Sequence, residues 1–231
     1  MAAQDFVNRV FSSVAERYDM MNDIMSFGLH RLWKNELCKF VSNGTGSLLD
    51  VAGGTGDIAM RVLEKHRNLK VTVCDISTDM LSVGRRKSID SGYIEIDWVC
   101  ASGERLPFAD STFDYYTIAF GIRNIPDRST ALREAYRVLK PCGRFLCLEF
   151  SPLSKKGAYK TAYDVYSLHV IPKIGKLVTG DEEAYLYLAE SIRAFPSPKE
   201  FANEVESANF FSVTHKNVCG GVATLYSAWK T

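Results

Sequence analysis

The chain has few of the features that mark membrane-spanning or nucleic-acid-binding proteins. No apolar run approaches the roughly 18 residues that a membrane-spanning helix needs, so we expect no membrane-spanning helix. The formal net charge is +1, whereas a nucleic-acid surface usually needs a clustered basic excess. The 231 residues, 46% of them hydrophobic and 24% charged, have the composition of an ordinary globular protein. We therefore expect one domain over residues 1–231 and no nucleic-acid partner.

Cysteine is also sparse and unpaired in the sequence. The six cysteines contain no CxxC pair, so their spacing supports no zinc or other metal site, and they are too few for a disulfide scaffold at this length. The first residues, MAAQDFVNRVF, lack the charged-then-apolar layout of a signal peptide, and Asp5 and Glu16 do not suit a transit peptide. We expect a targeting segment to be absent or already removed.

Strand and helix signals alternate from about residue 47 onward. Apolar runs end in turn residues and are followed by segments with helical spacing. Such alternation predicts parallel βαβ units in a doubly wound sheet. The expected strands are residues 47–52, 69–76, 97–101, 113–120 and 144–150, and the expected helices are residues 57–65, 78–87 and 129–139.

The C-terminal region has a different pattern. Two β-rich runs, residues 210–218 and 222–229, are separated by Cys219-Gly220-Gly221, which predicts a hairpin. Two segments lie outside the expected sheet. Residues 1–40 are predicted to be helical and to form a lid, and residues 155–206 form an insertion that we expect to contribute to a substrate pocket.

The turn after the first strand carries the strongest chemical signal. Asp50-Val51-Ala52-Gly53-Gly54-Thr55-Gly56-Asp57 combines glycines that let a ligand approach the backbone with a helix start that offers free N–H groups. Asp75 ends the second strand, where a carboxylate can bind a ribose hydroxyl. These residues indicate a nucleoside-containing cofactor, but Gly54-x-Gly56-x-x-Ala59 also satisfies the nicotinamide fingerprint.

Three features favour S-adenosylmethionine over a dinucleotide. Asp50, just before the glycines, can act on the cationic methionine end and would repel a pyrophosphate. The terminal hairpin is similar to that of class I methyltransferases, and Ala101-Ser102-Gly103-Glu104-Arg105-Leu106-Pro107-Phe108 resembles their adenine-bordering loop. The expected cofactor contacts are Asp50, Gly53, Gly54, Thr55, Gly56, Asp75, Ile76, Ser102, Gly103 and Ala119.

Longer motifs resemble one family over essentially the whole chain. The stretch YDMMNDIMSFGLHRLW at residues 18–33 is similar to YDxMNxxMSxGxHRxW of the ubiquinone/menaquinone-biosynthesis C-methyltransferases. The runs IAFGIRN and RFLCLEF resemble the eukaryotic, mitochondrial members of that family. Residues 120–124 (FGIRN), 137–151, 163–167 and 187–192 also match. Three positions depart from the family pattern: Cys142 replaces a turn glycine, Tyr226 replaces a histidine, and Ser102 replaces the aspartate or asparagine that contacts the adenine amino group in the family.

The resemblance implies a fold, a reaction and a setting. The fold is the class I, Rossmann-like methyltransferase fold, a mostly parallel sheet closed by an antiparallel C-terminal hairpin. The reaction is methyl transfer from S-adenosylmethionine to a ring carbon of 2-methoxy-6-polyprenyl-1,4-benzoquinol. The expected setting is the mitochondrial matrix, peripheral to the inner membrane and in a multi-enzyme ubiquinone-biosynthesis complex, with bacterial cytoplasm at the membrane face as the alternative. The resemblance is also compatible with a homodimer.

The reaction needs a nucleophilic ring carbon and stabilisation of a phenolate-like oxygen. Arg123 and Asn124 follow the fourth strand at the ligand-binding edge, and we predict them as catalytic residues. Arg123, always charged, would stabilise phenolate charge or orient a water. The alternative for Arg123, an ordinary ion-paired arginine, is outweighed only by the family match.

Four residues are predicted to contact the substrate: Tyr18, Met25, Tyr166 and His169. Other readings of the chain remain open at this point. They are a demethylmenaquinol methyltransferase, a cofactor-binding scaffold of a quinone-biosynthesis complex, a nicotinamide-dependent oxidoreductase, and a methyltransferase with a smaller substrate. Intact Asp50, Asp75, Arg123 and Asn124 argue against a pure scaffold.

Overall fold

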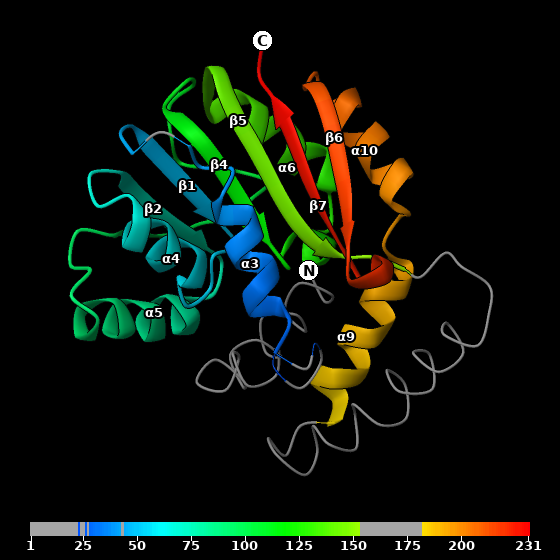
Figure 1. Cartoon of the computed structure of the whole chain (residues 1–231), viewed down its shortest axis with the longest axis horizontal. Helices are drawn as coiled ribbons and strands as arrows, with labels where there is room; N and C mark the ends of the chain where they lie inside the picture. The colour runs from blue at the N-terminus through cyan, green and yellow to red at the C-terminus, as the bar shows by residue number, and fades with distance from the viewer. Residues whose placement is uncertain (1–22, 24–25, 27, 43, 153–181) are drawn as a thin grey trace.

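A computed structural model describes residues 23, 26, 28–42, 44–152 and 182–231 (Figure 1). Within these residues seven strands form one sheet in the order β3-β2-β1-β4-β5-β7-β6. The first five strands pair in parallel, and β7 pairs antiparallel with both β5 and β6. The strands are β1 (Ser47–Val51), β2 (Lys70–Asp75), β3 (Asp97–Cys100), β4 (Phe113–Ala119), β5 (Leu139–Phe150), β6 (Phe211–Val218) and β7 (Ala223–Trp229).

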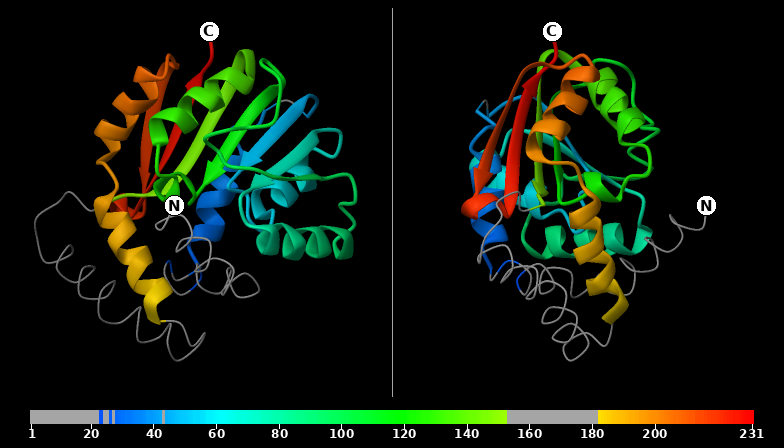
Figure 2. Two further views of the ribbon diagram at one scale, coloured as in Figure 1. Left: turned by 180° about the vertical axis from the view of Figure 1, so that it is seen from behind. Right: turned by 90° about the vertical axis from the view of Figure 1, so that its right-hand side faces the viewer.

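Helices cover both faces of the sheet. Helices α3 (His30–Cys38) and α4 (Asp57–Lys65) lie on one face, and α6 (Arg128–Val138) and α10 (Pro198–Ser207) lie on the other (Figures 1 and 2). Helix α5 (Thr78–Asp90) packs against β2 and β3. Because successive strand side chains point to opposite faces, Leu48 joins the core under α4 while Leu49 joins the core under α6.

The predicted elements are present, with several shifted boundaries. Helix α6 begins at Arg128 because the side chain of Asp127 caps it by accepting a hydrogen bond from the backbone N–H of Thr130. Strand β5 begins at Leu139, five residues earlier than expected, because Leu139 pairs with Phe113 of β4. Cys142, in the glycine position of the family pattern, takes a left-handed φ of 61°, so the turn keeps the backbone conformation that glycine favours.

The two segments assigned outside the sheet are described only in part. The described residues of segment 1–40 include α3, and those of segment 155–206 form α9 (Glu182–Ala194) and α10. Helix α10 packs against β6 and buries Phe201 completely, so it forms part of the cover of the sheet. Helix α9 contacts the short 3-10 turn η2 (Ile122–Asn124) that follows β4. The roles of these segments as lid and pocket stay predictions.

Candidate functional site

A hollow lies at the carboxyl-terminal edge of the sheet, beside β1 and β4. These two strands flank the point where the strand order reverses direction, and ligands bind at such points in open α/β sheets. Four of the predicted cofactor residues, from β1, its following turn and the end of β4, line the hollow together. The full lining is Lys34, Asp50, Ala52, Gly53, Thr55, Asp57, Ile58 and Ala119.

The turn between β1 and α4 has no room for side chains at its glycines. A Cβ on Gly53 would lie 2.9 Å from the carboxylate Oδ2 of Asp50 and 2.8 Å from Val73. Gly54 and Gly56 have φ values of 54° and 76°, a region that side chains disfavour. The turn therefore presents bare backbone, and α4 begins directly after Gly56 with N–H groups that lack intrahelical partners.

Asp50 is a buried carboxylate with one oxygen left over. Its side chain is on β1 and 1% exposed. Its Oδ1 accepts a hydrogen bond from the hydroxyl of Thr117 at 2.8 Å, while Oδ2 has no hydrogen-bond partner among the described residues. Burial raises the pKa of Asp50 to about 7. A buried acceptor without a partner is costly, and a cationic ligand in the hollow would satisfy it.

Asp75 ties the end of β2 to the glycine turn. Its Oδ2 accepts the backbone N–H of Gly54 at 2.8 Å, and its Oδ1 accepts that of Ser77 at 2.9 Å. Burial raises its pKa, and these backbone hydrogen bonds oppose the rise. Each carboxylate oxygen retains a further lone pair, so the predicted contact with a ribose hydroxyl is compatible with this geometry. Ile76 follows at 38% exposure.

The predicted adenine loop lies against the same edge of the sheet. The backbone N–H of Ala101 donates to the carbonyl of Asp75 at 3.1 Å. A Cβ on Gly103 would lie 3.3 Å from Val51 at the end of β1, so the loop packs closely there. The Ser102 hydroxyl is 3.2 Å from the backbone N–H of Glu104, from which it accepts. The contact of Ser102 with adenine stays a prediction.

Arg123 lies in a buried ion pair, which is the alternative considered for it above. Its Nη1 donates to Oε1 of Glu149 at 2.6 Å and to the carbonyl of Phe120 at 2.5 Å. The exposed fractions of the two charged side chains are 1% and 0%. The Nε of Arg123 has no hydrogen-bond partner within the described part of the chain. A catalytic role for Arg123 therefore rests on the guanidinium N–H groups that neither Glu149 nor Phe120 accepts.

Glu149 was not predicted as a functional residue. It is the one acidic residue in the apolar run Arg144-Phe145-Leu146-Cys147-Leu148-Glu149-Phe150, and a charge at that place indicates a buried partner. Burial raises the pKa of Glu149, while Arg123 and two backbone N–H groups oppose the rise. The single acidic residue in this apolar run indicates a buried charge, but the sequence does not show which residue Glu149 contacts.

Asn124 contacts helix α9. The hydroxyl of Tyr187 donates to Oδ1 of Asn124 at 3.2 Å, which leaves the amide N–H groups of Asn124 for another acceptor. Burial raises the pKa of Tyr187, and the nearby Arg123 opposes the rise. Tyr187 lies in one of the family-like motifs, but it was not predicted as a site residue.

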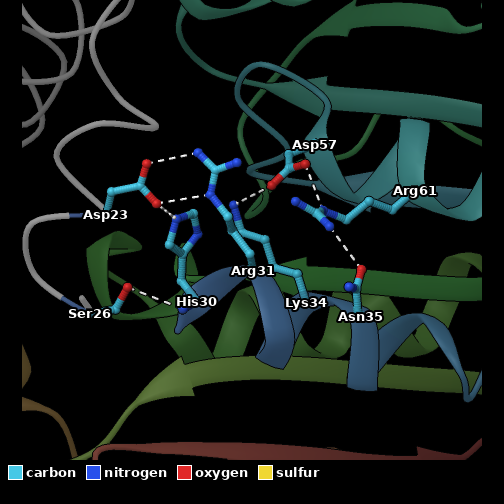
Figure 3. A network of polar contacts seen from close by, with 8 residues as sticks. All are labelled: Asp23, Ser26, His30, Arg31, Lys34, Asn35, Asp57 and Arg61. Atoms are coloured by element: carbon cyan, nitrogen blue, oxygen red, sulfur yellow. Dashed lines mark hydrogen bonds and ion pairs between the residues drawn. The ribbon is translucent and has the colours of Figure 1, made fainter. Parts of the chain in front are cut away.

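The start of α3 contributes a polar network that adjoins the hollow (Figure 3). The Nζ of Lys34 donates to Oδ2 of Asp57 at 2.8 Å. One turn earlier, Nε2 of His30 lies 2.8 Å from Oδ1 of Asp23, and burial lowers the pKa of His30. The guanidinium of Arg31 holds the pKa of Asp23 at about 2. Lys34 was not predicted as a site residue, although it directly follows the N-terminal motif.

Several predictions lie beyond what the structure describes. The four predicted substrate contacts, Tyr18, Met25, Tyr166 and His169, are outside the described residues. Within the described ranges, no helix is long and apolar enough to cross a membrane. A search of the same ranges finds no group of three or more histidine, cysteine, aspartate or glutamate side chains that could hold a metal ion.

Comparison with known sequences gives matches over nearly the full length. The ubiE/COQ5 methyltransferase family matches residues 1–230. The chain is 50% identical to the ubiquinone/menaquinone biosynthesis C-methyltransferase UbiE of Rickettsia bellii (strain OSU 85-389), over 98% of this chain and 93% of that protein. The protein of the same name from Rickettsia felis is also 50% identical, with the same coverage.

Comparison with solved structures supports the fold. A Haemonchus contortus phosphoethanolamine N-methyltransferase 2 in complex with S-adenosylmethionine has a TM-score of 0.71 at 16% identity, over 100% of this chain and 60% of that one. The [4+2]-cyclase SpnF has a TM-score of 0.73 at 14% identity, over 97% and 94%. One neighbour is named a methyltransferase and the other a cyclase, so the fold alone does not determine the reaction.

Proposed function

The chain belongs to the ubiE/COQ5 methyltransferase family, and on that premise we propose that it methylates a ring carbon of 2-methoxy-6-polyprenyl-1,4-benzoquinol, with S-adenosylmethionine as the methyl donor. The observation that carries the proposal is 50% identity over 98% of the chain to proteins named ubiquinone/menaquinone biosynthesis C-methyltransferase. The class of enzyme follows from this membership: an S-adenosylmethionine-dependent C-methyltransferase.

The residues around the hollow fit that cofactor. The Oδ2 of Asp50, which has no partner in the described part of the chain, is a suitable acceptor for the α-ammonium of the methionine part. The bare backbone at Gly53 and Gly54 lets the ligand approach closely, and Asp75 is placed for the ribose. When bound, S-adenosylmethionine supplies a methyl group on a sulfonium, which a carbon nucleophile can attack.

On the substrate side, we propose that Arg123 and Asn124 donate hydrogen bonds to a quinol oxygen. Glu149 neutralises the guanidinium, so the pair carries no net charge and Arg123 acts as an oriented donor through the N–H groups that Glu149 and Phe120 do not accept. The amide of Asn124, held by Tyr187, would supply a second donor. Stabilising the phenolate raises electron density on the ortho carbon, and donors fixed in advance favour the developing oxyanion.

A second substrate is supported by the names of the relatives. Those names cover both ubiquinone and menaquinone biosynthesis, so demethylmenaquinol is the alternative acceptor. Both substrates present a hydroxyl beside the carbon to be methylated, and the same donors would serve both. A cofactor-binding scaffold and a nicotinamide-dependent oxidoreductase remain outcomes of the test.

The proposal extends to the membrane association and the protein partners of the enzyme. A polyprenyl quinol partitions into lipid, so we propose that the protein acts at a membrane surface, in the mitochondrial matrix or at the bacterial inner face, within a multi-enzyme quinone-biosynthesis complex. Flotation of the purified protein with cardiolipin-containing vesicles tests the membrane contact. Recovery of all the protein in the unbound fraction would contradict it.

The direct test is methyl transfer to a short-tailed benzoquinol and to a short-tailed demethylmenaquinol. We expect a product that is heavier by one CH₂ group, with the new methyl on the ring carbon by NMR, and no product from the oxidised quinone. Asp75→Ala should abolish activity because it removes the ribose contact, whereas Lys199→Gln on α10 should not change it. Methylation at oxygen, or binding of NADH in place of S-adenosylmethionine, would contradict the proposal.

A further inference from the structure

Lys34 is a buried cation in the wall of the hollow. It lies on the face of α3 that packs against the domain, between Trp33 and Leu37 in the core, and its side chain is 5% exposed. Lysine is almost never buried to this extent without a charged partner. Its partner is Asp57 at the start of α4, and both residues line the hollow together with Asp50.

The ion pair between Lys34 and Asp57 belongs to a cluster with a net positive charge. The other oxygen of Asp57, Oδ1, accepts a hydrogen bond from Nε of Arg61 at 2.7 Å, and Arg61 is held in place by Asn35 at 2.8 Å. Figure 3 shows Lys34 and Arg61 reaching the two oxygens of Asp57. One carboxylate therefore serves two cations, and the cluster of Lys34, Asp57 and Arg61 has a net charge of +1.

The hollow thus presents two opposite charges to a ligand. Oδ2 of Asp50 is a buried acceptor without a described partner, and the ammonium of Lys34 has three donors, of which Asp57 accepts one. The amino-acid end of S-adenosylmethionine carries an α-ammonium and an α-carboxylate on one carbon. A buried anion and a buried cation in one small hollow complement this zwitterion.

We infer that Lys34 binds the α-carboxylate of the cofactor's methionine part, while Asp50 binds its α-ammonium. The inference rests on the proposed function, since it names a contact to the proposed cofactor. It assigns α3 a direct part in cofactor binding, because this helix brings a residue from outside the β1–α4 turn to the methionine end. The alternative is that Lys34 has a structural role only and joins α3 to α4 through its ion pair with Asp57.

Truncating the ligand separates the two readings. S-adenosylhomocysteine carries the amino-acid end and 5′-methylthioadenosine lacks it, so the ratio of their dissociation constants reports on that end alone. By calorimetric titration we expect Lys34→Gln to raise the dissociation constant of S-adenosylhomocysteine by about tenfold or more, as for a lost hydrogen bond between charged groups. The dissociation constant of 5′-methylthioadenosine should change by less than about twofold.

Two further variants make the test specific. Asp57→Asn also breaks the ion pair but keeps the cation, so the ratio should change much less than in Lys34→Gln. Lys39→Gln removes one charge from the exposed end of α3 and should leave the ratio as in the wild type. Equal weakening of both ligands in Lys34→Gln, or equal changes in Lys34→Gln and Asp57→Asn, would overturn the inference in favour of a structural role.

The outcomes also separate this inference from the proposed function. If the wild type binds neither adenosyl ligand, the proposed function fails. If the wild type binds both ligands but Lys34→Gln leaves the ratio of their dissociation constants unchanged, the inference fails and the proposed function stands. Should Lys34→Gln not fold, as judged by circular dichroism, Lys34→Arg keeps the charge while moving it. Because this change moves the cation, any loss of affinity should fall on S-adenosylhomocysteine and not on 5′-methylthioadenosine, and equal weakening of both ligands would overturn the inference.

Discussion

Single residues at the edge of the sheet combine burial with charge, and the pair of Arg123 and Glu149 is the clearest example. Both side chains are almost fully buried, and they are joined at 2.6 Å. Removing one partner of a buried pair leaves an uncompensated charge, which is strongly destabilising. The pair therefore has a structural role whatever Arg123 does to the substrate, and activity losses in its variants must be read beside stability.

For Glu149→Ala we expect the free energy of unfolding to fall by about 3–5 kcal/mol, measured by urea denaturation. The matched control is Glu204→Ala, which breaks the half-exposed pair with Arg128 and should cost at most about 1 kcal/mol. Similar losses in the two variants would show that the Arg123–Glu149 pair is not buried in solution.

Asp50 gives a second prediction at this scale, through its raised pKa of about 7. Below that pH the carboxyl is protonated and cannot pair with the ammonium of the cofactor. We therefore expect the affinity for S-adenosylhomocysteine to fall as the pH is lowered from 8 to 5. Calorimetric titration at each pH measures this, with Asp50→Asn as the control, because this variant should bind weakly without the same pH dependence.

Protonation of Asp50 has the opposite effect on stability. The native state holds the proton up to a pH of about 7, whereas the unfolded state releases it near the ordinary value of 3.8. The contribution of Asp50 to the free energy of unfolding therefore decreases as the pH rises from about 4 to about 7 and is constant above that. A flat difference between the wild type and Asp50→Asn over this range would contradict the raised pKa.

At the scale of elements, the loops after β1 and β4 touch each other closely. A Cβ on Gly121, after β4, would lie 2.4 Å from Cβ of Ala52, after β1. Both are Cβ atoms, whose positions the backbone fixes, so neither can move aside by a change of rotamer. This contact fixes the width of the ligand-binding edge, because the hollow lies between these two loops.

We expect Gly121→Ala to lower the free energy of unfolding by about 1–3 kcal/mol, as overpacking does, and to weaken S-adenosylhomocysteine binding. Chemical denaturation and calorimetry measure the two effects. Gly92→Ala is the control. Gly92 has a φ of 80°, and no atom of the described residues lies within 4 Å of its Cβ position, so this substitution should cost stability through backbone strain without changing affinity. Unchanged stability in Gly121→Ala would contradict the close contact, and unchanged binding would contradict its effect on the ligand-binding edge.

Elements were predicted from the sequence more successfully than the contacts between them. Helix α4 has the expected bounds, Asp57–Lys65, because the glycine turn marks its start and its apolar residues repeat with helical spacing. The ion pair of Lys34 with Asp57 could not be predicted in the same way. It joins residues 23 positions apart, and no local periodicity connects them.

The same distinction applies to the candidate site. Asp50, Gly53, Thr55 and Ala119 were predicted from strand ends and glycines, and they line one hollow. Glu149 and Tyr187 were missed as site residues because their function depends on the partners that folding brings to them. The charge of Arg123 was predicted from its residue type, but its neutralisation by Glu149 depends on the pairing of β4 with β5.

For the whole molecule, cofactor binding should add to stability. A ligand that binds only the native state at about 100 times its dissociation constant adds about 2.7 kcal/mol. For a protein of this size that corresponds to a rise in Tm of roughly 5–10 °C. Differential scanning fluorimetry with S-adenosylhomocysteine measures this rise.

Two comparisons make the thermal shift specific for the cofactor site. NADH should give no shift, because the carboxylate of Asp50 in the hollow would repel a pyrophosphate bound at the glycine turn. Asp75→Ala should reduce the shift with S-adenosylhomocysteine, and this variant must first be shown to unfold cooperatively. A rise with NADH in the wild type would favour the oxidoreductase reading.

The strand order also has a consequence for how the protein is made. Strand β7 pairs with β5 on one side and β6 on the other, yet it follows both in the chain. During translation, β6 has no strand to join until β7 has left the ribosome, and until then the edge of β5 is open to other chains. A chain truncated between the two strands should therefore be protease-sensitive in the sheet, whereas the chain that includes β7 should resist cleavage there.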